Sequence, residues 1–233
     1  MTPEEYGAAI TDVAAGVARV RERIAAAARR SGRRPEDVAL VAVTKGVDPD
    51  RIRTAIAAGV ADLGESRVQE AASKIEAVGR SVRWHLVGHL QRNKAARAAA
   101  LFAVIHSVDS AALLAELSAR AEHPLDVLLQ VNIAREPQKH GVLPDALPAL
   151  VRDAAGLRRV RIAGLMTIAP QVPEPEQARP VFRRLRELRG ELGRLLGAPL
   201  PHLSMGMTDD FEVAVEEGAT LVRIGRAIFG ARG

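Results

Sequence analysis

Eight short apolar runs rich in Val, Ile and Leu alternate along this chain with longer amphipathic stretches. Strands that alternate strictly with helices form parallel sheets, and eight such units close into a barrel. The sequence therefore predicts an α/β fold, a single (β/α)₈ TIM barrel, with an open doubly wound sheet as the alternative. The runs cover residues 38–44, 60–64, 84–88, 102–108, 126–133, 161–168, 202–206 and 220–225.

One domain accounts for all 233 residues. We expect residues 1–31 to form a leading helix and residues 38–233 to form the barrel. No linker, repeat or low-complexity segment interrupts this pattern. With 48% apolar residues, a chain of this length can bury roughly 70 to 75% of its extended surface, so its core needs no disulfide.

Composition excludes several classes of function. The chain has no cysteine, which excludes disulfides, thiolate nucleophiles and cysteine-ligated zinc. Its start does not resemble a signal peptide, and no run approaches the roughly 18 apolar residues of a membrane span. The net charge is +5, but acids interleave with the arginines and only 3% of residues are aromatic. We therefore expect a cytoplasmic protein that binds neither membrane nor nucleic acid.

The first apolar run ends on a lysine, Lys45. In a (β/α)₈ barrel the site lies at the carboxyl ends of the strands. By alternation Lys45 shares a face with Val41 and Val43, and either face of the strand could be the lumen. A partly desolvated lysine has more neutral amine, the form that attacks carbonyls. The alternative is a lysine that merely reaches water from the strand end.

The eighth run predicts a second component of a site. Alternation places Arg223 and Gly225 on the lumen face, while Val222 and Ile224 face the helices. An arginine inside a barrel needs a hydrogen-bond acceptor. Gly225 and Arg226 then open a short helical turn whose free N–H groups suit a phosphate.

The seventh run ends beside the eighth and offers the Ser204 hydroxyl and a turn at Gly206 to the same ligand. These residues together suit a ligand that has an aldehyde for Lys45 and a phosphate for Ser204, Gly225 and Arg226. Pyridoxal 5'-phosphate (PLP) has both, and its pyridine nitrogen could accept from Arg223. An aldose phosphate satisfies the first two requirements, so both ligands remain open at this point.

Seven motifs, in order from about residue 38 to the C-terminus, closely resemble the pyridoxal phosphate homeostasis protein family. The resemblance implies a PLP-bound barrel related to the N-terminal domain of alanine racemase, with an internal aldimine on Lys45. It also implies phosphate contacts from Ser204, Gly225 and Arg226, and Arg223 near the pyridine nitrogen. The motifs are VAVTKG, LGESRVQEA, WHLVGHLQRNK, QVNIAREPQKHG, GLMTIAP, LSMGMTDDFEVAVEEGATLVRIG and AIFGAR.

Three residues depart from the commonest form of this family pattern. Ser66 stands where many members have Asn, His89 where Pro or Arg is frequent, and Arg226 where Thr is common. The backbone N–H of Arg226 would remain available to a phosphate, but a hydroxyl contact is lost. The change at Ser66 puts a polar contact near the ring in doubt.

Other polar residues have simpler interpretations. Asp209 and Asp210 could be a catalytic carboxylate pair, but with Glu212 they are typical of a helix start with a capping box. His85 and His89 straddle a strand and its turn, where four residues separate side chains by some 13 Å, so we expect no metal between them.

Three further residues are expected at or near the site. Trp84 and Met166 are interpreted as packing residues, although Met166, at a strand end, could touch the cofactor. Lys139 lies beside His140 in the loop after the fifth run. A loop lysine is usually only solvated, so a role for Lys139 in relaying PLP is a hypothesis.

Three functions fit a lysine and a phosphate site on a barrel: an amino-acid racemase, a sugar-phosphate aldolase and a PLP carrier. A racemase needs a second acid, often tyrosine, but the only tyrosine is Tyr6, on the leading helix. An aldolase lysine would want nearby carboxylates, which GLMTIAP lacks. The sequence therefore favours a non-catalytic, monomeric PLP protein of vitamin B6 homeostasis, whose partners are PLP and apo-enzymes that receive it.

Overall fold

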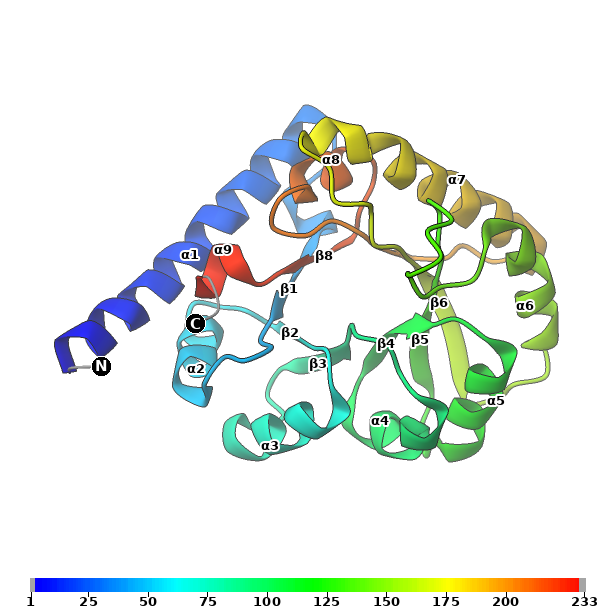
Figure 1. Cartoon of the computed structure of the whole chain (residues 1–233), viewed down its shortest axis with the longest axis horizontal. Coiled ribbons are helices and arrows are strands. Elements are labelled where there is room, and N and C mark those ends of the chain that lie inside the picture. Colours follow the sequence, from blue (N-terminus) through cyan, green and yellow to red (C-terminus); the bar gives the residue numbers. More distant parts are fainter. Residues whose placement is uncertain (1–2, 231–233) are drawn as a thin grey trace.

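The computed structural model describes residues 3–230, with side chains from residue 13 onward. Eight parallel strands form a closed barrel in the order of the chain, β8 pairing with β1, and helices surround it (Figure 1). The prediction of an α/β (β/α)₈ barrel is confirmed. The strands are β1 (Ala39–Val43), β2 (Asp62–Glu65), β3 (Arg83–Leu86), β4 (Val104–Val108), β5 (Leu125–Gln130), β6 (Val160–Met166), β7 (His202–Ser204) and β8 (Leu221–Ile224).

Helices fill the connections between the strands. None of those in the described part of the chain is both long and apolar enough to cross a membrane. The α-helices are α1 (Pro3–Arg30), α2 (Pro49–Ala57), α3 (Val68–Val78), α4 (Ala95–Leu101), α5 (Ala111–Arg120), α6 (Leu147–Asp153), α7 (Arg179–Leu196), α8 (Phe211–Glu216) and α9 (Arg226–Phe229). Short 3₁₀ turns are η1 (Pro35–Asp37), η2 (Arg92–Lys94), η3 (Pro144–Ala146) and η4 (Pro175–Ala178).

The expected leading helix is α1, which packs along α9, α8 and α2 (Figure 1). The side chain of Tyr6 lies outside the described residues. Two ion pairs join α1 to α8, Arg23 to Glu212 at 3.0 Å and Arg30 to Glu216 at 2.8 Å. The helix therefore braces the helices next to the strands β8 and β1, where the barrel closes. Its buried stripe has the helical spacing of three or four residues: Val13, Val17, Val20, Ile24, Ala27 and Ala28.

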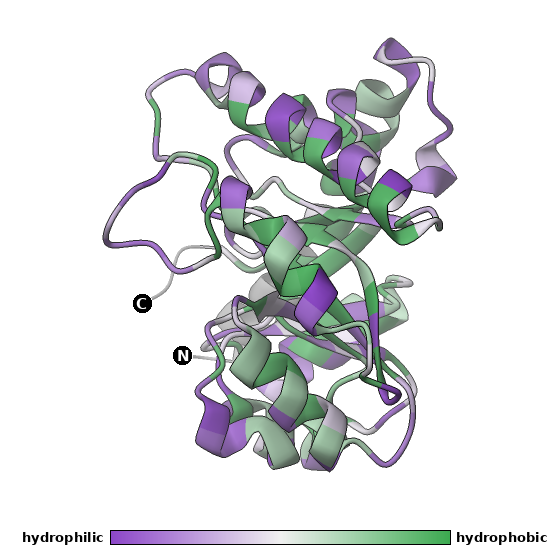
Figure 2. Ribbon diagram, turned by 90° about the vertical axis from the view of Figure 1, so that its right-hand side faces the viewer, coloured by the Kyte–Doolittle hydropathy of each residue, from purple (hydrophilic) through white to green (hydrophobic). Residues whose placement is uncertain are grey.

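The strands have two apolar faces, which is why they read as continuous hydrophobic runs. In Figure 2 the strands are largely hydrophobic, while hydrophilic segments concentrate on the surrounding helices and loops. Residues facing the helices include Leu40, Ala42, Val222 and Ile224. This pattern confirms the predicted face of β8 and places Val41, the neighbour of Lys45 on its face, in the lumen. The lumen is packed by Val41, Val104, Leu128, Ala163, Met166 and Leu221.

Candidate functional site

A cavity of about 660 Å³ opens at the carboxyl ends of the strands. This is the expected place for a ligand in a (β/α)₈ barrel, and the volume suits a small cofactor. One part of the wall is apolar, from Val43, Val87 and Ile168. The polar side chains of the wall belong to Ser66, Gln171, Thr208, Asp209, Asp210, Arg223 and Arg226.

Lys45 is half-buried and follows β1. It comes two residues after Val43, whose side chain lines the cavity. Within the described residues, the ammonium of Lys45 has no hydrogen-bond or ion-pair partner. The amine at the end of the first strand is therefore available to a ligand.

The backbone around Lys45 is held by four residues that we call the Lys74 cluster: Thr44, Glu65, Glu70 and Lys74. The Lys74 ammonium donates to Glu65 Oε1 and to Glu70 Oε1, both at 2.7 Å, and also to the Thr44 carbonyl. The Thr44 hydroxyl donates to Glu65 Oε1 at 2.6 Å. Burial raises the pKa of Glu65, although the bonds from Lys74 and Thr44 oppose this shift.

The next residue after Lys45 is held by the same cluster. The N–H of Gly46 donates to Glu70 Oε1 at 2.7 Å. Burial raises the pKa of Glu70, but the bonds from Gly46 and Lys74 outweigh it and the net shift is downward. The chain is therefore fixed on both sides of a lysine whose own side chain is free.

Arg223 projects into the lumen from β8 and lines the floor of the cavity. Only 4% of it is exposed. Its Nη1 donates to Ser204 Oγ at 2.6 Å, and its Nη2 donates to the Thr167 carbonyl at 2.9 Å. Burial lowers the pKa of Arg223 to about 10, with the charge of Asp210 opposing the shift, so the guanidinium is charged at neutral pH.

Behind Arg223 lies a buried series of hydrogen bonds that we call the Arg223 chain: Arg223, Ser204, His106, His85 and Asp62. Ser204 Oγ lies 2.8 Å from His106 Nδ1, and His106 Nε2 lies 2.9 Å from His85 Nδ1. His85 Nε2 lies 2.8 Å from Asp62 Oδ1. The Arg223 chain thus connects the cavity to an acid on β2.

One arrangement of protons satisfies every bond in the Arg223 chain when both rings are neutral. The pKa of His106 is well below its usual value. Burial is the largest cause, and electrostatic interactions with His85, Arg223 and His202 act in the same direction. Because Asp62 accepts, His85 donates from Nε2 and accepts at Nδ1 from His106. His106 then accepts from the Ser204 hydroxyl, which accepts from Arg223. The pKa of Asp62 is lowered on balance because hydrogen bonds from His85 and Arg83 outweigh the effect of burial.

Ser204 and Gly206, like Lys45, are not among the residues that line the cavity. Ser204 is fully buried and its hydroxyl bonds Arg223 and His106, so contact with a phosphate would require it to leave these partners. Gly206 has φ +92°, and a Cβ there would lie 2.6 Å from Ala214 Cβ on α8. Glycine is needed for this turn and close packing. After the turn, Met207 and Thr208 line the cavity, and neither was predicted as a site residue.

Gly225 and Arg226 line the cavity where α9 begins, and Gly225 is the N-cap residue. The side chain of Arg226 forms an exposed ion pair with Asp209 across the cavity mouth. Arg226 is the first residue of α9, after β8, and Asp209 lies in the connection after β7.

The prediction of a capping box at α8 is wrong. Asp210 is the N-cap residue, but its side chain makes no bond to the helix. It accepts instead from the N–H of Met207 at 2.6 Å. Burial raises the pKa of Asp210. Glu212, the other expected member of the box, forms an ion pair with Arg23 on α1 instead.

The remaining expectations concern packing residues. Trp84 is buried and donates to the Gly79 carbonyl at 3.1 Å. Met166 is fully buried in the lumen below the cavity. His85 belongs to the buried Arg223 chain while His89 lies in the exposed loop after β3, so the two histidines do not form a pair.

Lys139 lines a second, smaller cavity of about 240 Å³ that shares Val87, Gly88 and Ile168 with the first. Its ammonium donates to the Ala169 carbonyl at 3.0 Å and pairs with Glu136. The lysine is therefore occupied by protein groups at the edge of the main cavity.

A closed barrel with a free lysine after β1 and a buried arginine on β8 defines a class, the alanine racemase N-terminal domains. The model of that family matches residues 17–233. The alanine racemase of Corynebacterium glutamicum has the same fold, with a TM-score of 0.69 at 16% identity over 94% of this chain and 60% of that one.

Within this class the chain belongs to the pyridoxal phosphate homeostasis protein family, which confirms the resemblance of its motifs. The protein of that name from Aquifex aeolicus is 45% identical over 220 residues, covering 93% of this chain and 96% of the relative. The structure of PipY from Synechococcus elongatus PCC7942 with PLP bound has a TM-score of 0.79 at 38% identity, over 91% of this chain and 100% of that one.

Proposed function

We propose that this protein binds PLP covalently through Lys45 and serves in PLP homeostasis without catalysing a reaction. The observation that carries the proposal is a Lys45 amine without a partner among the described residues, two residues after Val43, which lines the same cavity as the fixed Arg223. The PLP-bound PipY structure and the names of the relatives support it. PLP supplies an aldehyde that condenses with a lysine amine.

The residues of the cavity fit the other parts of this cofactor. The apolar wall suits the faces of a flat ring. A guanidinium has five N–H donors, and Arg223 uses only two nitrogens for Ser204 and Thr167, so it can also donate to a ring nitrogen. The N–H groups at Gly225 and Arg226 and the Thr208 hydroxyl suit the phosphate. In this arrangement Ser204 acts beneath the cofactor by orienting Arg223, and Gly206 shapes the turn.

The same residues argue against racemase or transaminase chemistry. An arginine beside the ring nitrogen disfavours its protonation and so weakens the ring as an electron sink. No tyrosine side chain lies among the described residues to act as a second acid. Asp209 is paired with Arg226, and Asp210 is bonded to the Met207 N–H. A sugar-phosphate aldolase remains the weaker alternative.

The wider role follows from these proposals. Residues 1–233 would work as one cytoplasmic, monomeric domain that holds a reactive aldehyde and releases it to apo-enzymes. Lys139 would assist the release from its place at the cavity edge. Its substitution by alanine should slow hand-over of PLP to an apo-enzyme, and an unchanged rate would exclude this role.

The test of covalent binding is borohydride reduction followed by peptide mapping by mass spectrometry. We expect added pyridoxyl phosphate on Lys45, none in Lys45→Ala, and full labelling of Lys45 in the control Lys139→Ala. An unmodified Lys45 after incubation with excess PLP would overturn the proposal and favour a sugar phosphate. An amino-acid racemisation rate well above that of free PLP would instead overturn the non-catalytic role alone.

A further inference from the structure

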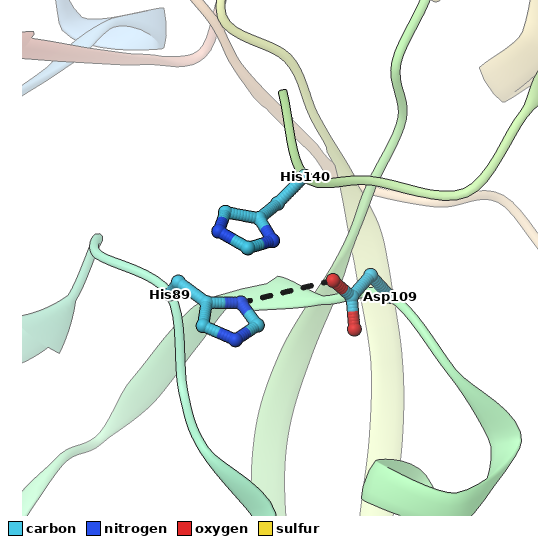
Figure 3. Close-up of side chains that lie close together, drawn as sticks. All are labelled: His89, Asp109 and His140. Carbon is cyan, nitrogen blue, oxygen red and sulfur yellow. Dashed lines mark ion pairs between the residues drawn. The ribbon is translucent and has the colours of Figure 1, made fainter. Parts of the chain in front are cut away.

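Three metal-ligating side chains gather outside the proposed PLP site. His89 follows β3, Asp109 follows β4 and His140 lies in the loop after β5, so three separate connections bring them together (Figure 3). Each offers one ligand atom, and these atoms lie within 4.8 Å of one another. His89 Nδ1 is 3.8 Å from Asp109 Oδ2.

The two imidazoles have no packing role that explains their position. They stack at 3.8 Å between centroids with planes 9° apart, and both residues are exposed. Both line the smaller cavity, next to Lys139. Neither belongs to the Lys74 cluster or the Arg223 chain, and His89 is one of the positions where this chain departs from the common family pattern.

We propose that His89, Asp109 and His140 bind a divalent transition-metal cation of the borderline class, with Zn²⁺ as the reference ion. Imidazole nitrogen suits Zn²⁺, Ni²⁺ and Cu²⁺, whereas Mg²⁺ and Ca²⁺ prefer sites built of oxygen. Three protein ligands leave further coordination positions for water. The single carboxylate partly offsets the charge of the ion, which makes such a cation a better ligand here than an anion.

Small movements of exposed side chains complete the site. With bonds of roughly 2.0 to 2.2 Å, ligand atoms around tetrahedral zinc lie about 3.4 Å apart. The separation of His89 and Asp109 is already near this value. Lone pairs lie in the plane of each ring, so the parallel stack must open for both nitrogens to point at one ion. The His89 side chain is 38% exposed, so rotation meets little resistance.

The site would be exchangeable rather than permanently filled. Metal-bound histidines are usually fixed by a hydrogen bond to their other nitrogen, and loss of such a partner typically weakens binding by about 10- to 100-fold. Within the described residues, the second nitrogens of His89 and His140 have no such partner. Bound metal would tie together the connections after β3, β4 and β5 at the edge of the smaller cavity.

Calorimetric titration of untagged, PLP-loaded protein with ZnCl₂ tests the proposal. We expect one Zn²⁺ per chain, with affinity reduced at least about tenfold in His89→Ala and in His140→Ala. Asp109→Asn should weaken binding as well. The matched control is His123→Ala, which removes an exposed histidine that precedes β5, at the opposite end of the strand from His140, and should bind as the parent does.

Two outcomes would overturn the site. One is affinity within threefold of the parent in both His89→Ala and His140→Ala, and the other is an equal loss in His123→Ala. Because PLP can itself bind metals, the titration is repeated on Lys45→Ala, where loss of binding would assign the ion to the cofactor instead. Visible absorption of bound Co²⁺, absent in His89→Ala, reports ligation directly and does not depend on PLP activity.

Discussion

On the β1 side of the cavity, the protein fixes the backbone around Lys45 and leaves its ammonium without a partner among the residues that the structure describes. On the β8 side, it fixes the functional group itself, because the Arg223 guanidinium bonds both Ser204 and the Thr167 carbonyl. The two side chains come from neighbouring strands, and Val41 of β1 pairs in register with Arg223.

If the proposed function holds, this difference matches what each group must do. A lysine that forms and releases a covalent bond must change its geometry, and its flexible four-carbon stem provides this freedom. An arginine beside a ring nitrogen must stay charged and oriented, which a buried acceptor series secures at the cost of desolvation. The Lys45 side chain is thus free to move, whereas the Arg223 guanidinium is held in one orientation.

The largest expected effect comes from breaking the Lys74 cluster. Lys74→Met leaves Glu65 buried without its cation, and removal of one partner of a buried pair costs about 3 to 5 kcal/mol. Urea denaturation measures the free energy of unfolding. The control Lys94→Met, at a part-exposed lysine on the surface, should change it by less than about 0.5 kcal/mol. A comparable loss in both variants would refute the structural role of the cluster.

A smaller effect is expected from the Arg223 chain. Ser204→Ala removes an acceptor for Arg223 and the partner of His106, which should cost about 1 to 3 kcal/mol. The neighbouring comparison is Ser107→Ala, because the buried Ser107 hydroxyl has no partner within the described residues, and its loss should be nearly neutral. If the proposed function holds, Ser204→Ala should also shift the absorption maximum of bound PLP. Equal stability of the two variants would show that the bond to Arg223 contributes nothing.

The pH dependence of stability tests whether the Arg223 chain keeps His106 neutral. Burial lowers the folded-state pKa of His106, so below the unfolded pKa of about 6.5 only the unfolded chain takes up this proton. Stability from this group is complete above that pH and falls by about 1.4 kcal/mol per pH unit as the pH drops. His106→Gln should reduce the slope but not abolish it, because burial also lowers the pKa of His202, and His123→Gln should retain it in full. Equal slopes in all three proteins would contradict a neutral His106.

The barrel, Lys45 and Arg223 could all be predicted from the sequence, for physical reasons. Strand–helix alternation determines the topology, and strand periodicity determines which residues face the lumen. Lys45 and Arg223 stood out because a charge on a buried strand requires an explanation. The partners did not stand out. Glu65 and Lys74 are nine residues apart, and it is the packing of α3 on β2 that brings them together. His106 and Ser204 are 98 residues apart, and only closure of the barrel brings them together.

Local patterns misled where tertiary partners competed with them. The segment around Asp209 and Glu212 has the spacing of a capping box, but Glu212 pairs with Arg23 on α1 and Asp209 pairs with Arg226 after β8. The sequence near Arg23 and near Arg226 does not indicate that these arginines pair with Glu212 and Asp209. Thr208 was not predicted for a related reason, since it lies in the connection beyond the end of β7, where strand periodicity no longer indicates which side chains face the site.

The smallest expected effect on stability comes from the exposed ion pair between Asp209 and Arg226 at the mouth of the cavity. Asp209→Asn breaks the pair with Arg226, whose side chains are 76% and 59% exposed, and such pairs contribute about 0 to 1 kcal/mol. Asp145→Asn breaks the pair with Arg135, at 76% and 54% exposure, and is a matched control. Denaturation at low and high salt should show small, similar and salt-sensitive losses for both. A much larger loss for Asp209→Asn alone would mean that the mouth of the cavity is held as firmly as its floor, and the contrast between a fixed interior and a free rim would fail.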